Sequence, residues 1–166
     1  DLYTLDLPNK EIRVGLYRCL LPNYIGSNTV KGTTTIAKMS ALIRRNDMDG
    51  ALGMLQAYLA TVPYCDNAYS EGHFQQMMYV IFSILDNYVD VEVRTPRGRV
   101  DMVLRTATHL YLFELKLNKD AATAMRQIDL KEYPKRFLLS GLPIVKVGIN
   151  FDVEQRNITD WTVSEG

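Results

Sequence analysis

The sequence predicts an α/β fold in which helices flank a mixed β-sheet. Apolar residues recur with helical spacing through much of the first half of the chain, and three strand-like segments then follow between residues 87 and 117. One helical segment, residues 121–132, separates them from two further strand-like segments. This order is that of a helix-covered sheet. At 166 residues the chain has the size of one compact domain. We expect residues 70–166 to form its core and residues 1–69 a helical extension packed on that core.

The N-terminal part is expected to be mostly helical. Residues 1–7 alternate leucines with polar residues and indicate a short extended segment, after which Asn9 is the expected N-cap of a first helix. Residues 23–34 are polar, contain two glycines and are expected to form a loop. Residues 35–45 are expected to form a second helix, and Asp47 is the expected N-cap of a third.

The helix expected after Ser70 is the most regular in the sequence. Its apolar side chains form one continuous stripe: Phe74, Met77, Met78, Ile81, Ile84, Leu85 and Tyr88. Glu71 lies three residues before Phe74, so it is expected on the face that packs on the sheet. Two interpretations stay open. Glu71 is either a first-turn acid stabilised by the helix dipole, or an acid directed at charged residues of the sheet.

Two neighbouring strand-like segments, residues 100–104 and 110–117, carry charged residues suited to chemistry. Glu114 and Lys116 lie two positions apart, so they share one face, opposite the apolar side chains of the same strand. If the two segments pair as a hairpin, Asp101 comes close to Glu114. The ordinary alternative is a half-exposed strand with its charges in water. The apolar start of the second segment favours a central strand instead, where charges are costly.

The remaining chain is expected to complete the sheet. Asp120 is the expected N-cap of the helix at residues 121–132, and Pro134 is expected to close that helix. Residues 144–150 form a continuous apolar strand, expected to run parallel to the strand of Glu114 because a helix joins the two. Residues 158–163 are expected to form a last strand at an edge.

Composition excludes several classes of protein. The formal net charge is zero, which argues against a constitutive, tight nucleic-acid binder but is compatible with an enzyme that has a local basic groove. Cys19 and Cys65 are isolated, so we expect neither a zinc site nor a disulfide framework, and we expect a cytoplasmic location. We expect no membrane span and no signal peptide. Residues 31–33 lack the GxxxxGK[ST] order of a phosphate loop, so nucleotide binding is not expected.

The segment GRVD, followed by a short turn and YLFELK, resembles the PD-(D/E)XK nuclease superfamily. The Asp, Glu and Lys of that signature match Asp101, Glu114 and Lys116, and the separation of the two acids, 114 − 101 = 13 residues, fits two strands and a tight turn. Val100 stands where the signature has Pro. The resemblance implies a restriction-endonuclease-like αβββαβ core with a mixed sheet flanked by helices.

A longer set of segments resembles a narrower group. RGRVDMVL, AMRQIDLKEYPKRFL and VKVGINFDVEQRNITDW together look like the C-terminal nuclease-like domain that follows an AAA-ATPase-like domain in certain prokaryotic proteins. This resemblance implies an ATPase-like domain elsewhere in the same polypeptide. The first residue is Asp rather than Met, and we therefore expect the sequence to be a C-terminal piece.

Two carboxylates beside a backbone carbonyl suit a hard cation such as Mg²⁺ or Mn²⁺. The expected ligands are Asp101, Glu114 and the carbonyl of Leu115, and Lys116 is expected to act on the attacking water. By resemblance, Glu71 supplies a further acid at the site. The resemblance also implies a Gln beside the metal site with a Tyr farther along the helix, which match Gln127 and Tyr133. The candidate phosphate contacts are Arg97, Arg99 and Lys119.

Three functions remain open. The first is a metal-dependent phosphodiesterase acting on nucleic acid, with DNA favoured over RNA. The second is a catalytically silent binding or regulatory module beside an ATPase-like domain. The third is a structural domain whose charges form an ion-pair cluster. The presence of Asp101, Glu114 and Lys116 together favours the first, whereas the zero net charge favours the second.

Overall fold

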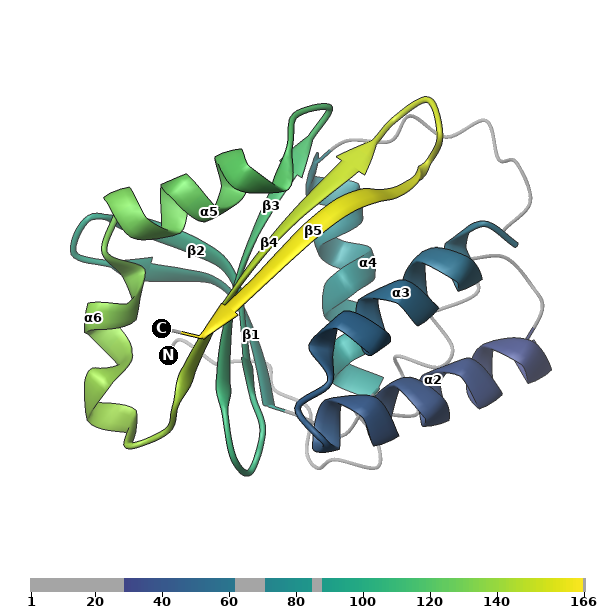
Figure 1. Ribbon diagram of the computed structural model, residues 1–166, viewed down its shortest axis with the longest axis horizontal. Coiled ribbons are helices and arrows are strands. Elements are labelled where there is room, and N and C mark those ends of the chain that lie inside the picture. The colour runs from purple at the N-terminus through teal and green to yellow at the C-terminus, as the bar shows by residue number, and fades with distance from the viewer. Residues whose placement is uncertain (1–28, 62–70, 85–87, 166) are drawn as a thin grey trace, which may run out of the picture.

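The structure, a computed structural model, describes residues 29–61, 71–84 and 88–165 (Figure 1). In chain order its elements are α2 (Thr29–Arg44), α3 (Met48–Leu59), α4 (Glu71–Ile84), β1 (Tyr88–Thr95), β2 (Gly98–Arg105), β3 (Leu110–Leu117), α5 (Ala121–Leu130), α6 (Tyr133–Phe137), the 3-10 turn η1 (Leu138–Ser140), β4 (Ile144–Asp152) and β5 (Asn157–Glu165). The predicted α/β class and order of elements are confirmed.

The five strands form one mixed sheet in the order β1-β2-β3-β4-β5. β1, β2 and β3 are joined by antiparallel pairing, β3 and β4 pair in parallel, and β4 and β5 pair antiparallel. β3 is central, and its residues from Leu110 to Lys116 are buried. The predictions of a central strand at residues 110–117, a parallel neighbour and a final edge strand are therefore confirmed.

Helices cover both faces of the sheet. α2, α3 and α4 lie on one face, and α5 and α6 lie on the other (Figure 1). Each face buries its own apolar cluster. Phe113 of β3 packs on Phe82 of α4 with ring centroids 5.3 Å apart, whereas Leu110 and Leu112 of the same strand belong to the cluster that holds Ile128 of α5. This alternation along β3 separates two environments within one strand.

The cap predicted for α3 is present, because Asp47 Oδ1 accepts a hydrogen bond from the Gly50 N–H at 2.8 Å. The loop predicted for residues 23–34 is wrong for its last part, since α2 already begins at Thr29. Gly32 and the neighbouring threonines lower helix propensity by at most about 1 kcal/mol each. Packing of α2 through buried residues such as Met39 outweighs that cost.

The helix predicted for residues 121–132 is shorter than expected. α5 ends at Leu130, and Pro134 lies at the start of α6 rather than closing α5. Proline suits the first turn of a helix because its missing N–H would have no partner there. Glu132, with φ of 50°, makes the turn between the two helices.

Other predictions fall on residues outside the described part of the chain. These are the segment 1–7, the helix after Asn9, the expected place of Ser70 just before a helix, and the surroundings of Cys19 and Cys65.

Candidate functional site

The candidate site lies where β2 and β3 part. The two strands pair from Arg105↔Leu110 to Met102↔Phe113. Beyond that pair, a side chain and not a backbone carbonyl accepts the hydrogen bond from β3. Asp101 Oδ2 accepts from the Leu115 N–H at 2.8 Å. The carboxylate is thereby held against the strand that carries Glu114. The half-buried Asp101 side chain keeps this position in contact with solvent.

Glu114 and Lys116 form a buried ion pair beside this point. Lys116 Nζ lies 2.7 Å from Glu114 Oε1, and the two residues are 8% and 1% exposed. They share the face covered by α5, while Phe113 and Leu115 point into the opposite cluster. The structure therefore brings the three predicted residues together around β3.

A buried ion pair is weak support for stability, because taking both charges out of water costs about as much as their attraction returns. Apolar residues would fill the same space at no such cost. The position of Glu114 and Lys116 in the middle of a central strand therefore points to a chemical use for this pair.

Tyr133 links α6 to β2 beside the candidate site. Its hydroxyl donates to the Arg99 carbonyl oxygen at 2.6 Å, and the residue is fully buried. Burial raises the pKa of the Tyr133 phenol, a hydrogen bond with Gln127 opposes that rise, and the nearby Glu114 and Asp101 carboxylates add to it. Tyr133 thus lies near the two acids, and Gln127 contacts Tyr133.

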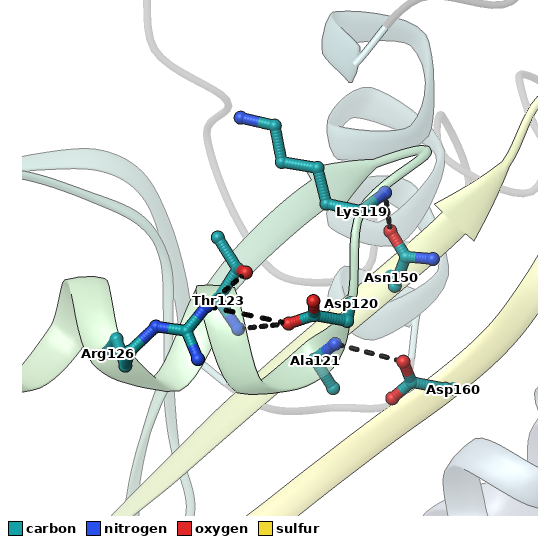
Figure 2. A network of polar contacts seen from close by, with 7 residues as sticks. All are labelled: Lys119, Asp120, Ala121, Thr123, Arg126, Asn150 and Asp160. Carbon is teal, nitrogen blue, oxygen red and sulfur yellow. Dashed lines mark hydrogen bonds and ion pairs between the residues drawn. The ribbon is translucent and has the colours of Figure 1, made fainter.

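The loop that follows β3 is held by two residues that the sequence did not single out (Figure 2). Asn150 of β4 is the parallel partner of Lys116, and its Oδ1 accepts from the Lys119 backbone N–H at 2.8 Å. Asp160 of β5 accepts from the Ala121 N–H at 3.0 Å. The sequence did offer one signal for Asn150, because it is a polar residue at the end of the apolar strand expected at residues 144–150.

The N-terminus of α5 also carries its predicted cap. Asp120 accepts a hydrogen bond from the Thr123 backbone N–H. The hydrogen bond with the Thr123 side chain, and then this backbone bond, lower the pKa of Asp120. Asp160 and Asp120 therefore accept the hydrogen bonds of two N–H groups in the first turn of α5, those of Ala121 and Thr123 (Figure 2).

The other predicted residues are placed as follows. Glu71 is the first residue of α4, the helix on the opposite face, and its side chain lies outside the described part of the chain. Arg97 NH1 lies 2.8 Å from Glu132 Oε2. Arg99 is exposed at its side chain and meets Tyr133 through its carbonyl. The Lys119 side chain is exposed and extends away from Asn150 and Asp160 (Figure 2).

The donors at this place fit a divalent cation of the Mg²⁺ type. Asp101, Glu114 and the Leu115 carbonyl offer only oxygen, which Mg²⁺ and Mn²⁺ prefer, and Mg²⁺ usually takes one or two protein carboxylates and keeps several waters. A carboxylate has about four lone-pair sites, so Glu114 can hold Lys116 and coordinate an ion together. Within residues 29–61, 71–84 and 88–165, no group of three or more His, Cys, Asp or Glu side chains is arranged for metal binding.

Other parts of the described chain are less suited to chemistry. An apolar hollow of about 440 Å³ lies between α2 and α3, on the opposite side of the sheet from the carboxylates, and Met54 and Tyr58 are among its lining residues.

No helix in the described segments is long and apolar enough to cross a membrane.

Two comparisons with known proteins place the chain in a family. The family model described as PD-(D/E)XK nuclease superfamily matches residues 69–161, which include Asp101, Glu114 and Lys116. The chain is also 30% identical over 168 residues to the "Uncharacterized protein in vnfD 5'region" of Azotobacter chroococcum mcd 1. That match covers 97% of this chain and 32% of the relative, so the chain spans about a third of the relative's length. With its mixed five-stranded sheet between helices, a restriction-endonuclease-like arrangement, the chain belongs to the PD-(D/E)XK nuclease superfamily.

Proposed function

We propose that this domain hydrolyses phosphodiester bonds of nucleic acid, with DNA favoured over RNA, in a reaction that depends on Mg²⁺ or Mn²⁺. The observation that carries the proposal is the buried Lys116–Glu114 pair, 2.7 Å apart, with Asp101 fixed on the neighbouring strand. Membership of a nuclease superfamily supports the reaction class. A cytoplasmic location, where such substrates occur, is part of the proposal.

Asp101, Glu114 and the Leu115 carbonyl would hold the ion, and Glu71 would supply a further acid. The bound ion would polarise the phosphate, neutralise developing charge and lower the pKa of an attacking water. The hydrogen bond from the Leu115 N–H fixes Asp101 Oδ2 at 2.8 Å and thereby orients that carboxylate. Burial and the nearby Glu114 and Asp101 carboxylates raise the pKa of the Tyr133 phenol and so keep it neutral beside the acids.

Lys116 would act directly on the reacting atoms. Its ammonium group is held by Glu114 Oε1 and has three donors, so it can orient the attacking water and stabilise negative charge on the phosphate. Burial of the pair strengthens both effects, because electrostatic interactions are stronger where water is excluded. Arg97, Arg99 and Lys119 are the proposed contacts to flanking phosphates.

Cleavage of labelled DNA and RNA, single- and double-stranded, tests the proposal. With Mg²⁺ or Mn²⁺ we expect wild-type cleavage that EDTA abolishes, and a loss of about 100-fold or more in Lys116→Ala, since a transition-state group is removed. Lys146→Ala is the matched control, because Lys146 lies on the neighbouring strand β4 and pairs with Asp129 instead, at 3.0 Å. Cleavage that survives in Lys116→Ala would contradict the proposal.

The second candidate is a catalytically silent binding or regulatory module attached to an ATPase-like domain. The zero net charge favours it. The ATPase-like partner rests on the resemblance of the sequence, and the matched relative has room for further domains because the chain covers 32% of it. Metal binding at Asp101 without cleavage of any nucleic acid would favour this candidate over the enzyme.

A further inference from the structure

The turn between β1 and β2 meets the junction of α5 and α6 in a cluster that we call the basic corner: Arg97, Lys131 and Lys135 around Glu132. Arg97 NH1 lies 2.8 Å from Glu132 Oε2, and Lys135 Nζ lies 2.6 Å from Glu132 Oε1. Lys131 lies over the turn, since a Cβ added at Gly98 would be 2.7 Å from Lys131 Cδ. Two of these three cations therefore pair with Glu132, and the third lies over the adjacent turn.

The basic corner carries an excess of positive charge in a chain whose formal net charge is zero. The hydrogen bond from Lys135 and the charge of Arg97 lower the pKa of Glu132, so this acid stays ionised and the corner keeps two uncompensated charges. Arg94 and Arg99, which are partners across the β1–β2 hairpin, add two more exposed cations beside it. A bound polyanion would offset the excess of positive charge at the basic corner.

The basic corner lies on the same side of the sheet as the candidate site. Glu132 is followed by Tyr133, whose hydroxyl donates a hydrogen bond to the Arg99 carbonyl. The Glu114 and Asp101 carboxylates lie close enough to Tyr133 to raise the pKa of its phenol. Arg97 lies in the turn just before β2, and Asp101 is three residues beyond Gly98 on that strand, a distance of about 10 Å at the usual rise of a strand. About three phosphates of one B-DNA strand lie along that length of helix axis.

We propose that the basic corner binds the phosphate backbone of the nucleic-acid strand whose scissile bond lies at Asp101, Glu114 and Lys116. The inference rests on the proposed function and extends it from the reacting atoms to the path of the substrate. Lys131 and Lys135 are the added contacts, and Arg97 is shared with the residues already proposed. The contact is to phosphates, so it carries no sequence preference.

Exposed leucines near the corner suggest one competing partner. Leu138 and Leu139 follow α6 and are 67% and 100% exposed, and a basic, apolar surface also suits an anionic membrane. The nucleic acid is favoured because the corner is joined through Tyr133 to the acids that would process it.

Binding without cleavage provides the test. The 166-residue chain is titrated in EDTA into a fluorescent 20-base-pair duplex and a single strand of equal length, across a series of salt concentrations. For the triple variant Arg97→Gln/Lys131→Gln/Lys135→Gln we expect binding to the duplex to weaken about tenfold or more. The slope of log K against log salt should fall by about 0.9 for each phosphate contact that is lost.

Two control variants accompany this test. Lys38→Gln/Arg44→Gln/Arg45→Gln removes three exposed cations in and just after α2, on the other side of the sheet, and should leave the slope unchanged. Lys131→Arg/Lys135→Arg keeps the charge and should retain binding, which separates loss of contact from loss of fold. Equal weakening by the two triple variants, or no weakening by the corner variant, would overturn the inference.

The outcomes also separate this inference from the proposed function. If the corner variant binds nucleic acid as tightly as wild type, and wild type cleaves it, the inference about the corner is rejected and the proposed function stands. Binding that needs the corner, without cleavage in Mg²⁺ or Mn²⁺, rejects the enzyme and keeps the corner as the surface of a binding module. Failure to bind either oligonucleotide, with corner-dependent binding to vesicles containing phosphatidylserine, rejects the corner as a nucleic-acid surface.

Discussion

The two faces of the sheet are built from the same strands but differ in chemistry. Towards α2, α3 and α4, β3 presents Phe113 and Leu115 to a large apolar cluster. Towards α5, it begins with apolar residues and then presents Glu114 and Lys116, buried and charged. One face therefore supplies stability, and the other buries the costly charges that we propose act on a substrate.

Phe113→Ala should cause the largest loss of stability, because it opens a cavity against Phe82 in the apolar face. We expect the free energy of unfolding to fall by about 3–5 kcal/mol, measured by urea denaturation followed by circular dichroism. Thr162→Ala, at an exposed position on edge strand β5, should change it by no more than about 0.5 kcal/mol. A loss in Phe113→Ala as small as that of the control would remove the contrast between the faces.

The charged pair should behave differently when both partners are replaced. Lys116→Met leaves Glu114 buried without its 2.7 Å partner and should cost about 3 kcal/mol. Glu114→Gln/Lys116→Met removes both charges and should be about as stable as wild type, since replacing a buried pair is often neutral or stabilising. A double variant that is as unstable as the single one would mean that the pair is there for stability.

Tyr133→Phe should have an intermediate effect of about 1–3 kcal/mol, because the Arg99 carbonyl loses its 2.6 Å hydrogen bond. The pKa of Tyr133 is raised in the folded state, first by burial. Its unfolded value is near 10.0, so the stability from the neutral phenol is present below pH 10 and is lost as pH rises through the folded pKa. Wild type should therefore lose more stability above pH 10 than Tyr133→Phe does.

Tyr111 provides the matching control on the apolar face. Its pKa is also raised by burial, with Glu165 rather than Glu114 adding to the rise. In an ultraviolet titration, Glu114→Gln should lower the pKa of Tyr133 and leave that of Tyr111 unchanged. Equal changes at both tyrosines would contradict the proximity of Tyr133 to the acids.

The smallest expected effect is at a helix end far from the site. Asp47→Ala removes the cap bond to the Gly50 N–H and should cost about 1 kcal/mol, while Asp47→Asn should cost less because asparagine caps equally well. Thermal unfolding measures both. Neither variant should change the rate of cleavage. A changed rate would mean that the α3 side of the sheet influences the candidate site on the other face.

Strand alternation made much of this arrangement predictable. The period of two placed Glu114 and Lys116 on one face, and hairpin pairing brought Asp101 beside them, as the structure has it. Likewise, Asp47 and Asp120 were identifiable as caps from their position before helical segments. These features depend on residues near one another in the chain.

Features that depend on distant packing were not predictable. The start of α2 at Thr29 depends on packing that outweighs weak helix propensity. The break between α5 and α6 rests on Glu132 at a positive φ, where most residues are unfavourable. The contacts of Asn150 with Lys119 and of Arg97 with Glu132 join segments 31 and 35 residues apart, which no local pattern encodes (150 − 119 = 31, 132 − 97 = 35).

We propose that the charged face of β3 binds a divalent ion through Asp101 and Glu114, and that Lys116 acts on the substrate and not as a ligand of the ion. The most direct measurement is the melting temperature of wild type, Asp101→Ala, Glu114→Gln and Lys116→Ala with increasing Mn²⁺. An ion that binds only the folded state stabilises it by about 2.7 kcal/mol at 100 times its dissociation constant. We predict a Mn²⁺-dependent rise in wild type and Lys116→Ala and none in the two acid variants. No rise in wild type, or an equal rise in Asp101→Ala, would contradict the claim and leave the charges as a structural ion-pair cluster.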